Sequence, residues 1–345
     1  MTRRSGTDAA DLAADRGDWP DPLDVGIDQV GPPLPLGRRI VLDGRGTTFI
    51  REVKGPEGAA TVLLLHGWIA SGGLNWFQAF GPLGGHFDVV AMDHRGHGRG
   101  IRSRRRFRLA DCADDAAALL RRLDTGPVIA VGYSMGGPIA QLLWRRHPDL
   151  VSGMVLCSTS HAFLRVVREK YLFMATMAAA VGTSRVGQVA ANLPTRIVRN
   201  LLPDGAAARP NSMQRWSLAE MRRHDLRHVM EAGLAIGNYD ASDWIGTVDV
   251  PTAVVVTAED RALAPERQLE TASLIPDASV HQFAGGHVAC AFPDFGGAVR
   301  DACLDVDRRS SRRARLTRRL FGPRRTNGSG APAATASAAA AATTG

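Results

Sequence analysis

The feature that most constrains the fold of this sequence is a serine between two glycines, in Gly132-Tyr133-Ser134-Met135-Gly136. The apolar run Val128–Val131 before it predicts a buried strand, and Pro138–Arg146 after it has a helical pattern. A serine at such a strand-to-helix turn is held in a strained backbone conformation with its hydroxyl accessible. Glycine two residues away on either side avoids a steric clash because it has no Cβ. The pattern therefore predicts that Ser134 is a nucleophile.

Short apolar runs alternate with helical patterns through the middle of the chain. Continuous apolar runs are typical of strands covered on both faces, as in a parallel sheet with crossover helices. We expect Asp111–Leu123 to be one crossover helix and the first two runs to form a hairpin. The expected strands are Arg38–Leu42, Thr47–Val53, Thr61–Leu65, Val89–Met92, Val128–Val131, Met154–Cys157, Thr252–Val256 and Ser279–Phe283.

The composition divides the chain further. Residues 1–36 are rich in Asp, Pro and Gly and are expected to form a disordered acidic arm. Residues 160–248 have helical patterns and no convincing strand, which predicts an all-helical cap inserted into a core of residues 37–159 and 249–305. Residues 306–345, a basic run and then a low-complexity Ala- and Thr-rich stretch, are expected to be a disordered tail. The expected cap helices are Phe163–Val181, Val186–Leu202, Ser212–His224 and Leu226–Ile236.

The positive net charge is a property of that tail. The chain has 42 basic and 34 acidic residues, and nine arginines with no carboxylate lie between Arg308 and Arg325; without them 33 basic residues face 34 acidic ones. The run has little aromatic interleaving and no nucleic-acid-binding fold beside it, so we expect no nucleic-acid partner. Leu316, Leu320 and Phe321 leave open a weak contact with a membrane or another acidic surface.

We expect a cytoplasmic protein. The longest apolar candidate, Leu172–Val181, is too short to span a membrane. Arg3 and Arg4 are not followed by the apolar region of a secretory signal.

A serine hydroxyl needs a base within hydrogen-bond reach, a third group that orients the base, and donors for the oxyanion. His287 follows the last expected strand and is the candidate base; His281 lies inside that strand and is a weaker choice. Asp260 follows the preceding expected strand and is the candidate acid, with the adjacent Glu259 as the alternative. The order Ser134, Asp260, His287 matches the nucleophile–acid–base order of the α/β-hydrolase triad.

Two backbone N–H groups are expected to form the oxyanion hole. One belongs to Met135, directly after the nucleophile, and the other to Trp68 in the loop His66-Gly67-Trp68.

With these residues in place, the chain resembles the α/β-hydrolase superfamily with a helical cap, over roughly residues 37–305. The resemblance rests on His66-Gly67-Trp68, Asp93-His94-Arg95-Gly96-His97-Gly98, the serine elbow, Asp260 and Gly286-His287. It implies an eight-stranded, mostly parallel sheet with the cap after the sixth strand. It also implies no cofactor.

Other residues have simpler interpretations. A zinc site requires ligands that converge and are backed by cysteine or carboxylate, and we expect instead that His66, His94 and His97 pack turns and loops around the site. Trp68 and Trp76 are expected to pack or to line the substrate pocket. Helix packing and an apolar pocket both fit the cap residues Leu172, Phe173, Met174, Met177, Leu201 and Leu202.

The four cysteines have no metal-binding spacing and are expected to be reduced thiols: Cys112, Cys157, Cys290 and Cys303. A reactive Cys290 is the alternative.

The sequence thus predicts a serine hydrolase that cleaves a carboxylic, apolar ester through an acyl-enzyme. Three alternatives stay open. A perhydrolase or haloperoxidase has an elbow that resembles Ser134-Met135-Gly136-Gly137; an acyltransferase would use the same acyl-enzyme; and a hydrolase-like fold can also serve as a non-catalytic receptor or scaffold.

Overall fold

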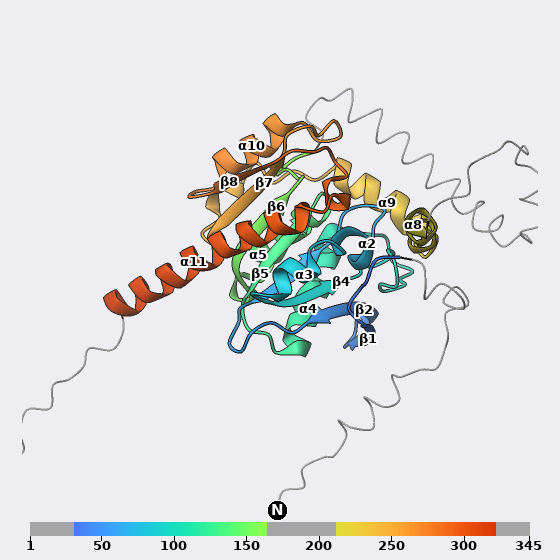
Figure 1. Cartoon of the computed structure of the whole chain (residues 1–345), viewed down its shortest axis with the longest axis horizontal. Coiled ribbons are helices and arrows are strands. Elements are labelled where there is room, and N and C mark those ends of the chain that lie inside the picture. Colours follow the sequence, from blue (N-terminus) through green and yellow to red (C-terminus); the bar gives the residue numbers. More distant parts are fainter. Residues whose placement is uncertain (1–30, 164–211, 322–345) are drawn as a thin grey trace, which may run out of the picture. The chain divides into compact units, whose positions relative to one another are not determined.

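The computed structural model describes residues 31–163 and 212–321, and its core is an eight-stranded sheet (Figure 1). The strand order is β1-β2-β4-β3-β5-β6-β7-β8. Only β1 with β2 and β2 with β4 pair antiparallel; all other neighbours are parallel. The predicted fold class is confirmed. The strands are β1 (Gly37–Leu42), β2 (Gly46–Val53), β3 (Thr61–Leu65), β4 (Asp88–Met92), β5 (Val128–Tyr133), β6 (Val151–Cys157), β7 (Thr252–Thr257) and β8 (Ser279–Phe283).

Helices cover both faces of the sheet, which explains why its central strands are apolar throughout. In β3, Leu63 and Leu65 pack into a buried cluster that includes α4 and α5, whereas Val62 and Leu64 pack into a second cluster that includes α3 and α11. The described helices are α2 (Gly72–Trp76), α3 (Phe80–Gly84), α4 (Leu109–Leu123), α5 (Gly136–Arg146), α8 (Ser212–Arg222), α9 (Leu226–Gly237), α10 (Pro265–Leu274) and α11 (Phe295–Phe321).

The helices α8 and α9 lie in the chain between β6 and β7, where the cap was expected. The buried carboxylate of Glu220 in α8 accepts a hydrogen bond from Ser71 Oγ at 2.8 Å and pairs with Arg99 at 3.1 Å. These bonds tie α8 to the loops after β3 and β4. The expected cap helices Phe163–Val181 and Val186–Leu202, apart from Phe163, lie outside the described residues.

The expected disorder from residue 306 is wrong for the first part of that segment, because α11 continues to Phe321. Contacts divide the chain into two units, residues 1–310 and 311–345. In the first unit Val306 is fully buried, and Ser310 Oγ donates to the carbonyl of Ser152 at 2.8 Å. Gly153 lets the helix approach, since a Cβ there would lie 2.2 Å from Val306 Cγ1. Val306 continues the buried row of Val299, Ala302 and Cys303 at helical spacing, so the core extends past residue 305.

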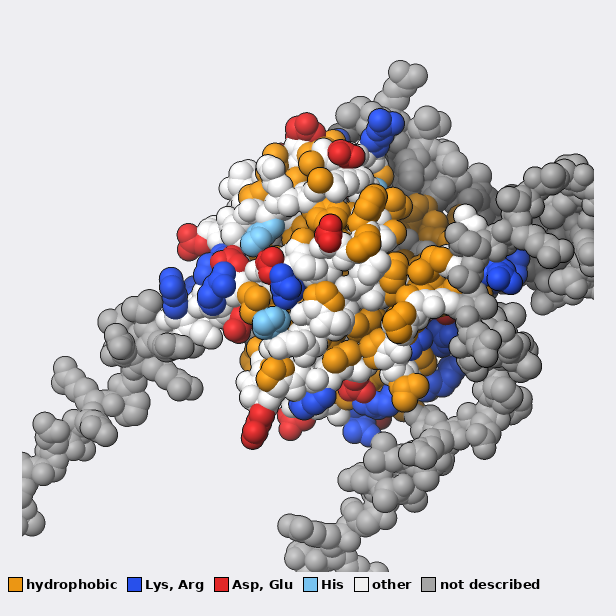
Figure 2. All heavy atoms as spheres, viewed as in Figure 1, with side chains coloured by type: hydrophobic (Ala, Val, Ile, Leu, Met, Phe, Trp, Pro, Cys, Tyr) orange, Lys and Arg blue, Asp and Glu red, His pale blue; other side chains and the backbone are white. Residues whose placement is uncertain are grey.

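Charge at the start of the basic run is partly compensated. Arg308 and Arg309 pair with Asp305 at 3.8 Å and 2.7 Å. Figure 2 shows basic and acidic side chains together along α11, and a second group of basic side chains beside β1 and β2. Among the described helices, none is long and apolar enough to cross a membrane.

Candidate active site

Ser134 occupies the turn between β5 and α5. Its φ is +50°, in the left-handed region that favours glycine, and the residue is 8% exposed. The flanking glycines fit only because they lack a Cβ: one on Gly132 would lie 2.3 Å from the carbonyl oxygen of Gly136, and one on Gly136 would lie 2.0 Å from that of Leu65. The strained serine turn expected from the sequence is therefore present.

The structure brings the three predicted triad residues together. Ser134 Oγ lies 3.0 Å from His287 Nε2, and His287 Nδ1 lies 2.8 Å from Asp260 Oδ2. Ser134 follows β5, Asp260 follows β7 and His287 follows β8, so all three lie at the carboxyl edge of the parallel strands. This arrangement places one imidazole between an alcohol and a carboxylate, the geometry that acyl transfer by a serine requires.

Asp260 is held as an anion. Burial by itself raises the pKa of this carboxyl, but hydrogen bonds from His287, from the Leu263 N–H and from Thr257 outweigh burial and lower the pKa below its usual value. Its Oδ1 accepts from the N–H groups of Ala262 and Leu263 at 2.9 and 2.8 Å. A carboxylate so fixed can orient His287 and stabilise its protonated ring.

The two weaker candidates lie elsewhere. Glu259 is exposed, and its backbone N–H donates to the carbonyl of Gly285. His281 lies within β8 and is 3.9 Å from Asp305.

Two side chains that sequence analysis did not single out support Asp260. Thr257 Oγ1 donates to Asp260 Oδ2 at 2.9 Å, and Gln268 Nε2 lies 2.9 Å from Thr257 Oγ1. Gln268 is fully buried at the second turn of α10. Thr257 stands in the segment that supplied Asp260, but no spacing signal in the sequence marks Gln268.

The two residues predicted for the oxyanion hole lie beside the nucleophile. The pairing of Leu65 with Gly132 puts the ends of β3 and β5 next to each other. A Cβ on Gly67 would lie 3.3 Å from Ser134 Cβ, so the loop that carries Trp68 runs against the serine. The Trp68 indole donates to the carbonyl of Val229 in α9 at 2.7 Å, and Met135 is fully buried. Oxyanion binding by these two N–H groups stays a prediction.

The histidines after β3 and β4 form a neutral packed group. His66 Nδ1–H donates to the carbonyl of Gly67 at 2.8 Å, and its Nε2 accepts from the His94 N–H at 2.9 Å. Burial lowers the pKa of His66 to about 4, so the ring is neutral at physiological pH. The rings of His94 and His97 lie 4.2 and 5.6 Å from it. Over residues 31–163 and 212–321, no group of three or more His, Cys, Asp or Glu side chains is arranged to hold a metal ion.

The cysteines are unpaired, and three of them are buried. Cys290 is half-buried, and burial raises the pKa of its thiol to about 11. A reactive thiol requires thiolate at neutral pH, so this environment argues against a reactive Cys290.

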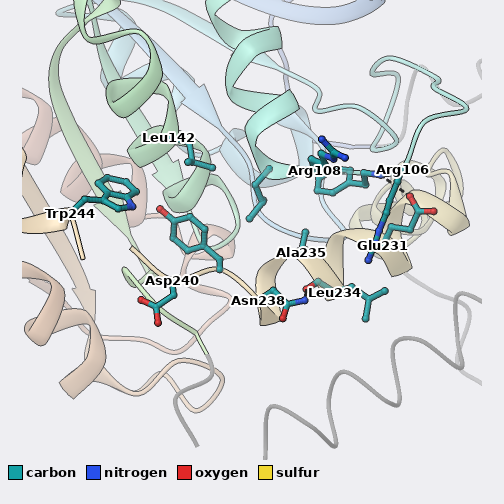
Figure 3. Close-up of a pocket in the computed structure, with 12 residues that line it drawn as sticks. Arg106, Arg108, Leu142, Glu231, Leu234, Ala235, Asn238, Asp240 and Trp244 are labelled. Atoms are coloured by element: carbon teal, nitrogen blue, oxygen red, sulfur yellow. Dashed lines mark hydrogen bonds between the residues drawn. The ribbon is translucent and has the colours of Figure 1, made fainter. Parts of the chain in front are cut away.

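A cavity of about 430 Å³ lies between α9, the start of α4 and α5. Figure 3 shows Leu234 and Ala235 of α9 on one side of it and Leu142 of α5 on another, with Arg106 reaching from the loop before α4 past Glu231. Neither Ser134 nor His287 lines this cavity. It is therefore separate from the candidate site.

The comparisons with known proteins agree on the fold family. The model for the alpha/beta hydrolase fold family matches residues 60–294. The chain is 29% identical over 235 residues to a pimeloyl-[acyl-carrier protein] methyl ester esterase of Chromobacterium violaceum, over 67% of this chain and 86% of that protein. It is 32% identical to a 2-(acetamidomethylene)succinate hydrolase of Mesorhizobium japonicum, over 35% of this chain and 41% of that protein. The chain spans about two fifths of the length of that hydrolase and of two further curated relatives.

Solved structures match over most of the fold. The enol-lactonase of Burkholderia xenovorans superposes with a TM-score of 0.60 and 19% identity, over 78% of this chain and 99% of that one. The esterase of Thermogutta terrifontis does so with a TM-score of 0.57 and 20% identity, over 83% and 99%. With the family match over residues 60–294, the conclusion is direct: this chain belongs to the α/β hydrolase fold family.

Proposed function

We propose that the protein is a serine hydrolase that cleaves a carboxylic ester, with Ser134 as nucleophile, His287 as general base and Asp260 as the group that orients the base. The observation that carries the proposal is the linked pair of contacts at 3.0 and 2.8 Å that joins the three side chains. The esterases among its relatives and structural neighbours support an ester as substrate. We also propose that this ester is apolar and that the protein acts in the cytoplasm.

The mechanism follows from the contacts. His287 Nε2 takes the Ser134 proton as Oγ attacks the ester carbonyl carbon. The Met135 and Trp68 N–H groups hold the oxygen, which becomes an oxyanion as the tetrahedral intermediate forms. The protonated imidazole gives its proton to the leaving alcohol, and the C–O bond breaks to leave an acyl-enzyme.

The second half of the reaction, in which the acyl-enzyme is hydrolysed, uses the same groups with water as the nucleophile. His287 takes a proton from water, which attacks the acyl carbon; the acid is released as the imidazole returns a proton to Ser134. Asp260 keeps the tautomer with a proton on Nδ1 throughout, because its Oδ2 accepts that hydrogen at 2.8 Å.

A fluorophosphonate probe tests the nucleophile. The wild-type chain should be labelled with one probe per molecule, and Ser134→Ala should abolish labelling. The matched control is Ser242→Ala, at an exposed serine, which should be labelled like wild type. Labelling that survives Ser134→Ala would refute the assignment.

Nitrophenyl esters of increasing acyl length then test the reaction and measure the depth of the acyl pocket. A flat absence of turnover with tight ligand binding would favour a non-catalytic receptor instead.

A second candidate is peroxide-dependent chemistry at the same serine. The elbow Ser134-Met135-Gly136-Gly137 favours it, as does a relative named as a non-heme chloroperoxidase in Streptomyces lividans, 26% identical over 70% of this chain and 89% of that protein. Activity that requires acetate and hydrogen peroxide, and exceeds ester turnover, would select this candidate. Acyl transfer would show as ester product formed when an alcohol is added.

A further inference from the structure

We propose that Tyr133 is a positioning residue for His287: its phenolic hydroxyl fixes the backbone of the loop that holds the candidate base against Ser134. The inference rests on the proposed function, because it concerns the alignment of the same base. The observation is a hydrogen bond of 2.6 Å from Tyr133 Oη to the carbonyl oxygen of His287.

The tyrosine ring is well placed to hold a loop. It is 3% exposed and packs edge-to-face against Trp76 at 6.1 Å and against Phe295 at 5.5 Å. Because burial raises the pKa of Tyr133 well above its usual value, the hydroxyl keeps its proton and stays a donor. Tyr133 is also the last residue of β5, directly before the nucleophile. Two consecutive residues therefore contact His287, one at its ring and one at its backbone.

The loop of His287 needs such a contact. It follows β8, which is an edge strand of the sheet, and it contains Gly285 and Gly286. The His287 side chain is 31% exposed and Val288 is 66% exposed, so side-chain packing at these two positions is incomplete, although Gly285 and Ala289 on either side are buried. Backbone bonds hold the two glycine carbonyls, from Glu259 N–H at 2.9 Å and Ala289 N–H at 3.0 Å. The hydroxyl of Tyr133 is what restrains the carbonyl of the base itself.

The expected effect of losing that hydroxyl is on chemistry and not on substrate binding. A displacement of about 1 Å at a reacting group can lower a rate about 100-fold. We expect Tyr133→Phe, which keeps the ring contacts, to slow acylation about 10- to 100-fold. KM should change by less than about twofold, because the phenol is buried and its hydroxyl is bonded to the loop carbonyl, which leaves neither group free to bind substrate.

The matched control is Tyr239→Phe, the same exchange at a tyrosine whose hydroxyl donates to Gln141 Oε1 at 2.9 Å in α5. Three proteins are compared: wild type and the two variants. For each, the second-order rate of fluorophosphonate labelling is measured, together with kcat and KM on a nitrophenyl ester. Rates are expressed per folded molecule from urea unfolding curves, so that a loss of stability is not counted as a loss of acylation.

Slow labelling and low kcat in Tyr133→Phe alone, with KM unchanged, would support the inference. Labelling of Tyr133→Phe at the wild-type rate, or equal slowing in both variants, would overturn it. A wild-type chain that is not labelled at all would instead overturn the proposed function, so the two failures are distinguishable.

Discussion

Acid should destabilise this protein through its buried histidines, and His224 allows the effect to be isolated. His224 Nδ1 accepts a hydrogen bond from the Gly98 N–H at 2.7 Å, so the ring is neutral when this bond is made. Its ring centre lies 5.4 Å from that of His97. Burial, with a further contribution from repulsion by His66 when that ring is protonated, lowers the pKa of His224 from 6.5 to about 4. If Nδ1 took up a proton, its N–H would face the Gly98 N–H, and this hydrogen bond would be lost.

The sign and size of the effect follow from these two pKa values. Above pH 6.5 the ring is neutral in the folded and the unfolded chain, so His224 adds no pH dependence. Between pH 6.5 and 4 only the unfolded chain takes up the proton, and the free energy of unfolding falls as the pH falls. At pH 5 the loss from this one ring is about 2 kcal/mol.

The perturbation is His224→Asn, since the amide oxygen of Asn can take the place of Nδ1 as acceptor while the side chain cannot titrate. Urea unfolding followed by tryptophan fluorescence gives the free energy of unfolding at pH 8 and at pH 5. Wild type should lose about 2 kcal/mol more than the variant between these pH values. His86→Asn, at an exposed histidine, is the matched control and should follow wild type.

Each protein is compared with itself at pH 8 and pH 5. Packing that is lost with the imidazole lowers the free energy of unfolding equally at both pH values, so it does not affect the test. His66, His94 and His97, which burial also shifts to lower pKa, remain in the variant, so part of the acid sensitivity must persist. A variant whose stability falls with pH as steeply as that of wild type would refute the reasoning.

Two further predictions follow from the contacts described. Asp260→Asn should lower kcat by about 10⁴-fold, because the amide stabilises the wrong imidazole tautomer. The control Glu259→Gln should keep near wild-type ester turnover. Similar losses of kcat in both variants would contradict the assignment of the acid. Val306→Ala removes two fully buried methyl groups and should lower the free energy of unfolding by about 2 kcal/mol in urea titrations. The control Asp301→Ala, on the exposed side of α11, should lower it by less than about 0.5 kcal/mol. An unchanged midpoint for Val306→Ala would mean that this turn of α11 does not pack on the sheet.

Local patterns were enough to predict the sheet and the serine turn. The β3 and β8 bounds expected from the sequence are those observed. For β3 the reason is that a strand buried on both faces is apolar throughout its length. The strained turn at Ser134 was predicted because the glycines at 132 and 136 meet a steric requirement of that turn alone. α11 was mispredicted beyond residue 305, because the arginines that follow Val306 obscured its helical spacing from Ala302 and Cys303.

Other features depend on segments that are distant in the chain. His287 is 153 positions from Ser134, and only the shared carboxyl edge of β5 and β8 brings them within 3.0 Å. Which of Glu259 and Asp260 contacts His287 is decided by the turn after β7, where the Ala262 and Leu263 N–H groups hold one carboxylate inward. The bond from Tyr133 to the His287 carbonyl has no sequence signature, because a hydroxyl that crosses between strands obeys no local periodicity. The sequence by itself thus determined the strands and the turn residues, because these depend on local residue patterns. Which side chains meet across the sheet was decided by the tertiary structure, because it depends on the order of the strands in space.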